Sequence, residues 1–113
     1  MTLQPERLKR RPEFRLVAAK GRKAPMPGLV LQALPRADEG AARIGFTVTK
    51  KVGNAVIRNR TRRRLKEAAR LWLRDHPVAG VDLVLIGRDG TRKRKFQTLQ
   101  DDFRRALAKA GVT

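Results

Sequence analysis

The stretch GFTVTKKVGNAVIRNRTRRRLKEAAR, residues 45–70, decides the architecture of this chain. Its beginning continues an alternating pattern, which predicts a half-buried strand with Ile44, Phe46 and Val48 on one face. KVGN then indicates a turn, and a helix is predicted from there over about 56–75. We therefore expect a strand that leads directly into a long helix.

The predicted helix has two contrasting sides. Its apolar side should pack on the core and consists of Leu65, Ala68, Ala69 and Trp72. The remaining surface is basic, because residues 50–70 hold nine Lys or Arg and a single acid, Glu67. His76 is expected to close this helix as a surface cap, where a cation complements the helix dipole.

Repulsion along the basic side is costly. Five basic pairs stand four positions apart, and at roughly 0.2–0.5 kcal/mol each they cost on the order of 1–2.5 kcal/mol at low salt. Only Arg63 and Glu67 have opposite charges at that spacing, and an exposed pair contributes less than about 1 kcal/mol. A run of charges is usually a solvated face, but this one favours a helix that binds phosphate.

Composition supports a polyanionic partner. The chain has 113 residues and a net charge of +18, and 41% of its residues are hydrophobic, which suits one globular domain. It has no Cys, which excludes disulfides and thiolate metal sites, and its single His cannot form a His-based metal site. No apolar run approaches a membrane span, so we expect a cytoplasmic protein without a membrane partner. Aromatic residues are too few to predict a stacking platform on a sheet.

The other elements complete an α+β pattern of order α-β-β-α-β-α, a two-layer sandwich with helices against one sheet. The flanking turn and cap signals predict a helix from Pro12 to Gly21, a loop over 20–28, strands over 29–35 and 81–87, a basic loop over 88–96, and a helix from Thr98 to before Gly111. Asp101 and Asp102 are interpreted as residues of the first turn of that helix, not as a metal pair.

The residues alone allow two functional classes to be compared. A ribosomal-protein-like module that binds ribosomal RNA would share the charge and the α+β class. A protein nuclease is disfavoured, because no carboxylate cluster or His pair stands at catalytic spacing. The helix carries mainly cations, which suits binding of a nucleic-acid backbone better than readout of bases.

The 45–70 stretch resembles the signature of the protein subunit of bacterial ribonuclease P, a strand followed by K-K-x-G-x-A-V-x-R-N-R-x-K/R-R. RLKRRPEFRLVAAKGRK, residues 7–23, is similar to the start of that family. The likeness covers most of residues 7–110. It implies one domain over 1–113 with a structured core of about 7–110, and a central mixed sheet with a left-handed crossover helix between parallel strands.

The resemblance also implies a function. In the family, a large RNA subunit performs catalysis and releases the mature 5′ end of precursor tRNA, using Mg²⁺ that is held mainly by RNA. The protein is an accessory subunit with no catalytic residue and no metal site of its own. The expected partners are the catalytic RNA subunit and precursor tRNA, with one protein for each RNA.

Two groups of site residues follow from the resemblance. The RNA-binding group is Lys50, Lys51, Asn54, Arg58, Asn59, Arg60, Arg62, Arg63, Lys66 and Arg70. The group at a cleft for the single-stranded 5′ leader is Phe14, Val17, Ala18, Lys20, Gln32 and Phe46. Ala18 and Gln32 stand where the family often has aromatic residues, so leader contacts are expected either to be weaker or to depend more on Lys20, Arg22 and Lys23.

Overall fold

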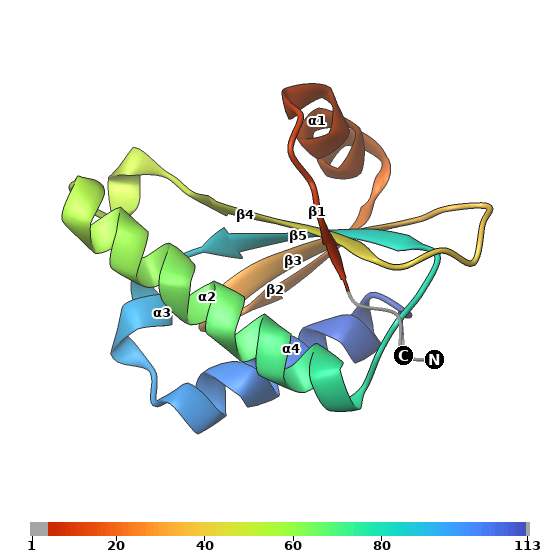
Figure 1. The fold of residues 1–113 in the computed structure, drawn as a ribbon. Helices are drawn as coiled ribbons and strands as arrows, with labels where there is room; N and C mark the ends of the chain where they lie inside the picture. Colours follow the sequence, from red (N-terminus) through yellow and green to blue (C-terminus); the bar gives the residue numbers. More distant parts are fainter. Residues whose placement is uncertain (1–4, 113) are drawn as a thin grey trace.

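A computed structural model describes residues 5–112 and contains one mixed, five-stranded sheet (Figure 1). The strand order is β1-β4-β5-β3-β2. The strands are β1 (Glu6–Arg7), β2 (Arg22–Met26), β3 (Leu29–Pro35), β4 (Arg43–Val48) and β5 (Val81–Gly87). The helices are α1 (Arg11–Lys20), α2 (Ala55–Asp75), α3 (Asp89–Lys93) and α4 (Phe96–Lys109), with a 3-10 turn, η1 (Lys50–Val52), before α2. The predicted α+β class and mixed sheet are confirmed.

The helices lie on both faces of the sheet. Figure 1 shows α2 and α4 below the sheet and α1 above it. The alternation of side chains along β5 explains this division, because Leu83 and Leu85 enter the large core beneath the sheet, whereas Val84 packs with Val17 of α1. The helices therefore pack against one sheet, as predicted, and the structure adds that α1 lies on the face opposite to α2 and α4.

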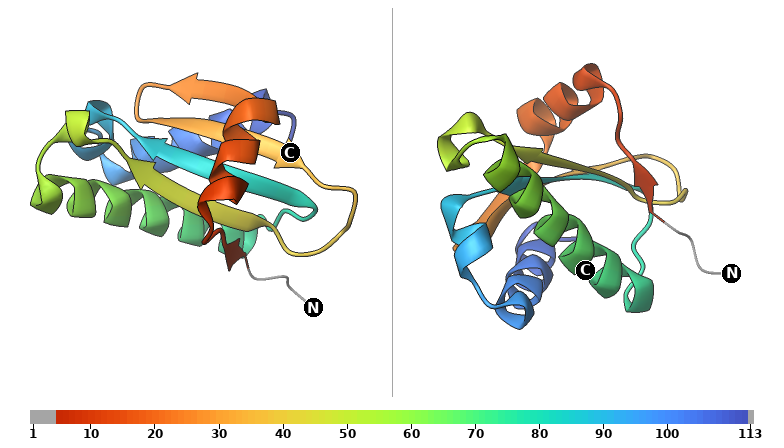
Figure 2. Two further views of the ribbon diagram at one scale, coloured as in Figure 1. Left: turned by 90° about the horizontal axis from the view of Figure 1, so that it is seen from above. Right: turned by 60° about the vertical axis from the view of Figure 1, so that its left-hand side comes forward.

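β4 and β5 are parallel neighbours, and α2 connects them. In the left view of Figure 2, α1 lies in front of the sheet and α2 lies on the other side, and the path from β4 through α2 to β5 is left-handed. Right-handed connections account for about 98% of such crossovers. The unusual handedness agrees with what the family resemblance implies.

Three short elements were not expected from the sequence. Residues 22–26 form β2 instead of a loop; Pro25 is tolerated because β2 is an edge strand that pairs only with β3. β1 is also an edge strand, of two residues, and pairs with β4. The predicted basic loop contains α3. The last helix begins at Phe96 and not at Thr98, because Phe96 packs against the core.

A buried carboxylate ties three parts of the sheet together. Asp82 of β5 accepts hydrogen bonds from Nε and Nη2 of Arg43, at 2.8 and 2.6 Å, and from Nη1 of Arg36 at 2.8 Å. Its side chain is 5% exposed. Burial alone would raise the pKa of Asp82, but the hydrogen bonds from the two guanidinium groups outweigh burial and hold the pKa below its ordinary value.

Replacing Asp82 with Asn should destabilise the fold by about 1–3 kcal/mol, because both arginines lose a charged acceptor. The pKa of Asp82 is lowered by folding, so its stabilising contribution is complete above the unfolded carboxyl pKa of about 4 and is lost as the pH falls through the folded value. Urea unfolding of the wild-type and Asp82→Asn proteins should therefore give free energies of unfolding that converge as the pH is lowered into the acid range. An equal difference at about pH 7 and about pH 2 would contradict this role.

Candidate nucleic-acid interface

α2 begins at a capped N-terminus. The Asn54 side chain accepts a hydrogen bond from the backbone N–H of Ile57 at 3.0 Å. Gly53 has φ 155°, a conformation that a side chain at this position would strain. These two residues set where the helix starts, so Asn54, which the family resemblance assigns to RNA binding, has a structural role as cap. Lys50 and Lys51 lie exposed in η1 just before it.

The inner side of α2 is apolar and the outer side is basic. Leu65, Ala68 and Ala69 are buried as predicted, and Leu73 joins them. Trp72 packs against the core but is only partly buried, and it stacks on His76 with ring centroids 3.7 Å apart. His76 closes the helix, as expected.

We define the basic face of α2 as the outward-facing residues of the predicted RNA-binding group: Arg58, Asn59, Arg60, Arg62, Arg63 and Lys66. Asn59, Arg60 and Arg63 are exposed, and the other three are half-buried. A hydrogen bond of 3.0 Å from Arg62 Nη1 to Asn59 Oδ1 links two of its members. The face is therefore accessible to a large partner along much of the helix.

Carboxylates do not screen the basic face. Among residues 5–112, no ion pair includes a cation of this face, Lys50 or Lys51. The predicted pair of Glu67 with Arg63 is wrong, since Glu67 binds Arg70, three positions away, instead. Arg70 is thus neutralised within the protein, unlike the rest of the predicted RNA-binding cations.

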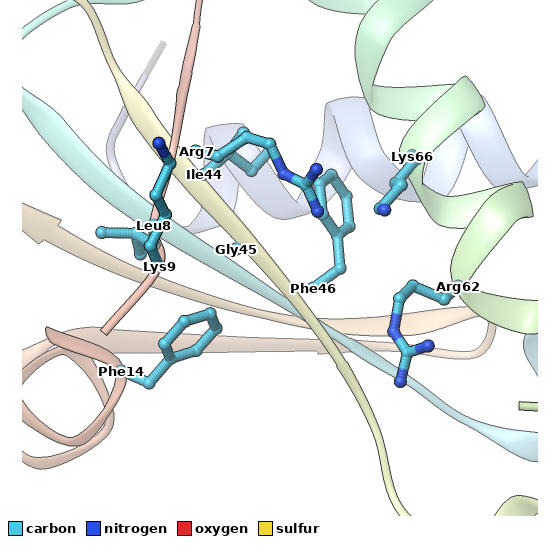
Figure 3. A pocket seen from close by; sticks show the side chains of 9 residues that line it. All are labelled: Arg7, Leu8, Lys9, Phe14, Ile44, Gly45, Phe46, Arg62 and Lys66. Carbon is cyan, nitrogen blue, oxygen red and sulfur yellow. The ribbon is translucent and has the colours of Figure 1, made fainter. Parts of the chain in front are cut away.

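A hollow of about 600 Å³ lies beside the basic face (Figure 3). We call it the β4 hollow, because Gly45 and Phe46 of β4 lie between its two sides. Arg7, Leu8, Lys9 and Phe14 line it on the side of β1 and α1, and Arg62 and Lys66 line it on the side of α2. The hollow exists because β1 pairs only with Arg43 and Ile44 and leaves the rest of the β4 edge uncovered.

The β4 hollow is strongly electropositive. Burial lowers the pKa of Lys66, and the neighbouring charges of Arg7 and Arg62 lower it further. Arg7, Arg62 and Lys66 thus lie close enough to repel one another, and among residues 5–112 none of the three forms an ion pair. An anion bound among them would relieve this repulsion.

The predicted leader-cleft residues separate into two sets. Phe14 and Phe46 both line the hollow, although Phe14 packs with the small apolar cluster around Val17 and Phe46 packs with the core on the other face of the sheet. Val17 has no exposed surface, so its place on a cleft surface is corrected: it anchors α1 from within.

The remaining three residues of that group do not line the hollow. Ala18 and Lys20 are exposed on α1, whereas Gln32 is 6% exposed on β3. Arg7 and Lys9, which were not predicted as site residues, also line the hollow. They carry no local sequence pattern and reach the hollow through the pairing of β1 with β4.

A second basic segment lies against α2. Arg64 donates hydrogen bonds to the carbonyl oxygens of Arg92 and Arg94 and so joins α2 to the end of α3. Arg94 also forms an ion pair with Asp102, which is 1% exposed, so this buried carboxylate has a cationic partner. The segment 92–95 therefore lies close to the basic helix.

Comparison with known proteins decides the family. A family model described as Ribonuclease P matches residues 3–111. The chain belongs to the ribonuclease P protein family. The ribonuclease P protein component of Gluconacetobacter diazotrophicus is 70% identical over 106 residues, which cover 94% of this chain and 91% of that protein. The component of Paramagnetospirillum magneticum is 46% identical over 116 residues, covering 99% and 87%.

Solved ribonuclease P proteins share the fold. The Staphylococcus aureus protein has a TM-score of 0.77 and 25% identity, with 94% of this chain and 95% of that chain covered. The Thermotoga maritima protein also has a TM-score of 0.77 and 25% identity, with 92% and 96% covered. As a ribonuclease P protein, the chain is a component of a ribonucleoprotein endoribonuclease that processes tRNA and a partner of the ribonuclease P RNA. Among its described residues, no helix could cross a membrane.

Proposed function

We propose that the basic face of α2, with Lys50 and Lys51, binds the phosphate backbone of the catalytic RNA. The observation that carries this proposal is the absence of ion pairs for these cations among residues 5–112. Free guanidinium groups bind phosphate oxygens with two parallel hydrogen bonds. Asn54 and Arg70 belong to the proposed interface only at its edges, because each already has a partner within the protein.

The β4 hollow is the proposed site for the single-stranded 5′ leader of precursor tRNA. Phe14 and Phe46 offer aromatic surface to a base, and Arg7, Arg62 and Lys66 offer charge to the adjoining phosphates. The hollow adjoins the basic face, because Arg62 and Lys66 belong to both. This position would bring a leader and the RNA subunit together. Ala18, Lys20 and Gln32 fall outside this proposal.

The proposed assembly has one protein for each RNA and uses Mg²⁺ held mainly by the RNA, in the cytoplasm. Within residues 5–112, no group of three or more His, Asp or Glu side chains lies close enough to hold a metal ion. The proposed task of the protein is to hold RNA and leader, and its cations would lower the electrostatic repulsion between them.

Reconstitution tests this function. Protein mixed with its cognate RNA should increase cleavage of precursor tRNA at near-physiological Mg²⁺ above that of the RNA alone. A control without protein at high Mg²⁺ shows that the RNA is competent. If the competent RNA gains nothing from the protein, the proposal is wrong; cleavage by the protein without RNA would point to a protein nuclease.

A further inference from the structure

α1 rests on the sheet through a small apolar contact. Val17 is the one α1 residue that is fully buried, and it packs in a small cluster with Leu8 and Val84. This cluster lies near the middle of the helix. The direction of the first turn, which carries Glu13 and Phe14, therefore depends on further contacts.

β4 supplies one such contact through an ion pair. Arg43 Nη1 donates to Glu13 Oε2 at 2.9 Å, and Glu13 Oε1 accepts from the backbone N–H of Arg10 at 3.1 Å. Arg43 is itself held by the buried Asp82, which receives two of its hydrogen bonds. The first turn of α1 is thus connected to β5 through a fixed guanidinium group.

The second contact is a close approach at Gly45. Side chains two positions apart share a face of a strand, so Gly45 lies on the same face as Arg43. A Cβ atom at Gly45 would lie 2.4 Å from both Cε1 and Cζ of Phe14, and 3.2 Å from Cβ of Leu8. The Phe14 ring therefore occupies the space that any side chain at position 45 would need.

We propose that Arg43 and Gly45 are positioning residues that fix the Phe14 ring as a wall of the β4 hollow and thereby set the preference for substrates with a leader. Arg43 holds the first turn of α1 through Glu13, and Gly45 leaves room for the ring beside β4. The inference rests on the proposed function of the hollow. Neither residue belongs to the basic face of α2.

Gly45→Ala tests the inference in the reconstituted holoenzyme. The measured quantity is the ratio of the dissociation constants for mature tRNA and for a precursor with a long leader. Displacement of the ring should reduce this ratio by at least about fivefold, the low end of the contribution from one stacked base. Affinity for the RNA subunit should stay within about twofold. Equal weakening for both tRNAs would overturn the inference.

A double-mutant cycle separates positioning from general damage to the fold. In a Phe14→Ala background, the alanine at position 45 no longer meets a ring, so it should cause no further loss of leader preference. Additive losses would show that Gly45 does not act through Phe14. If the wild-type holoenzyme has no leader preference, the proposed function of the hollow fails instead.

Glu13→Gln tests the contribution of Arg43 with little change in shape. The amide oxygen can still accept from the Arg10 N–H, but the ion pair with Arg43 is lost. Leader preference should fall, by less than in Gly45→Ala, with kcat for the bound precursor unchanged. Glu39→Gln, at an exposed loop acid, is the matched control for loss of one charge. An equal effect of both changes would exclude a specific role for the Glu13–Arg43 pair.

Discussion

Replacing both Arg62 and Lys66 with Glu should weaken assembly with the catalytic RNA by roughly 100-fold or more. Each change places a carboxylate where a phosphate is proposed to bind, and like-charge contacts in an interface cost several kcal/mol. Both side chains line the β4 hollow and belong to the basic face of α2, so binding of leader and RNA should suffer together. Filter binding or fluorescence titration of the labelled RNA measures the loss.

The matched control is Arg105→Glu with Lys109→Glu. Both residues are exposed on α4, outside the proposed interface, and the change in net charge is the same. The control should retain most of the RNA affinity, apart from the general effect of charge. Similar losses in the two double variants would mean that net charge, and not the place of the cations, determines binding.

Phe14→Ala should harm substrates that carry a leader and leave binding of mature tRNA nearly unchanged. Phe14 lines the hollow, and loss of one base–aromatic stack corresponds to roughly 5- to 150-fold in affinity. The measurement is the holoenzyme affinity for matched precursor and mature tRNA.

The alternative role of Phe14 is purely structural, because Phe14 packs beside Leu8 and Val84. Equal losses of affinity for the precursor and the mature tRNA, together with a lower melting temperature, would show that Phe14 acts only as a core residue. Leu16→Ala is a suitable control on the same helix, because Leu16 is 47% exposed and does not line the hollow.

Sequence patterns predicted α2 well because its signals are local. Asn54 caps the helix, and the apolar residues repeat with the helical period from Leu65 onward. β5 was equally clear, since a short apolar run is typical of a strand covered on both faces. Of these two elements, α2 carries most of the proposed interface, and β5 contributes to the sheet beside it.

What the patterns missed depends on pairing between distant parts of the chain. β2 contains Pro25 and is flanked by glycines, so it had the composition of a loop, and only its pairing with β3 makes it a strand. Arg7 and Lys9 enter the hollow only because β1 pairs with β4.

Helical periodicity also could not orient α1 in detail. The family resemblance assigned Phe14, Val17 and Ala18 together to the leader cleft, and helical periodicity could not tell which of them the sheet would bury. In the structure Val17 is buried, Phe14 is half-buried and Ala18 is exposed. The difference arises because α1 meets the sheet through a narrow contact, whose position is set by Leu8 and Val84 from other strands and loops.

The crowded, unpaired cations of α2 are proposed to bind a phosphate backbone. The salt dependence of RNA binding tests this proposal most directly. The logarithm of the binding constant should fall linearly with the logarithm of salt concentration, by roughly 0.7–0.9 for each neutralised phosphate. Replacing Arg60 and Arg63 with Ala should make that slope shallower by about 1.4–1.8 if each contacts one phosphate. A slope identical to that of the wild-type protein would show that this side of α2 faces away from the RNA.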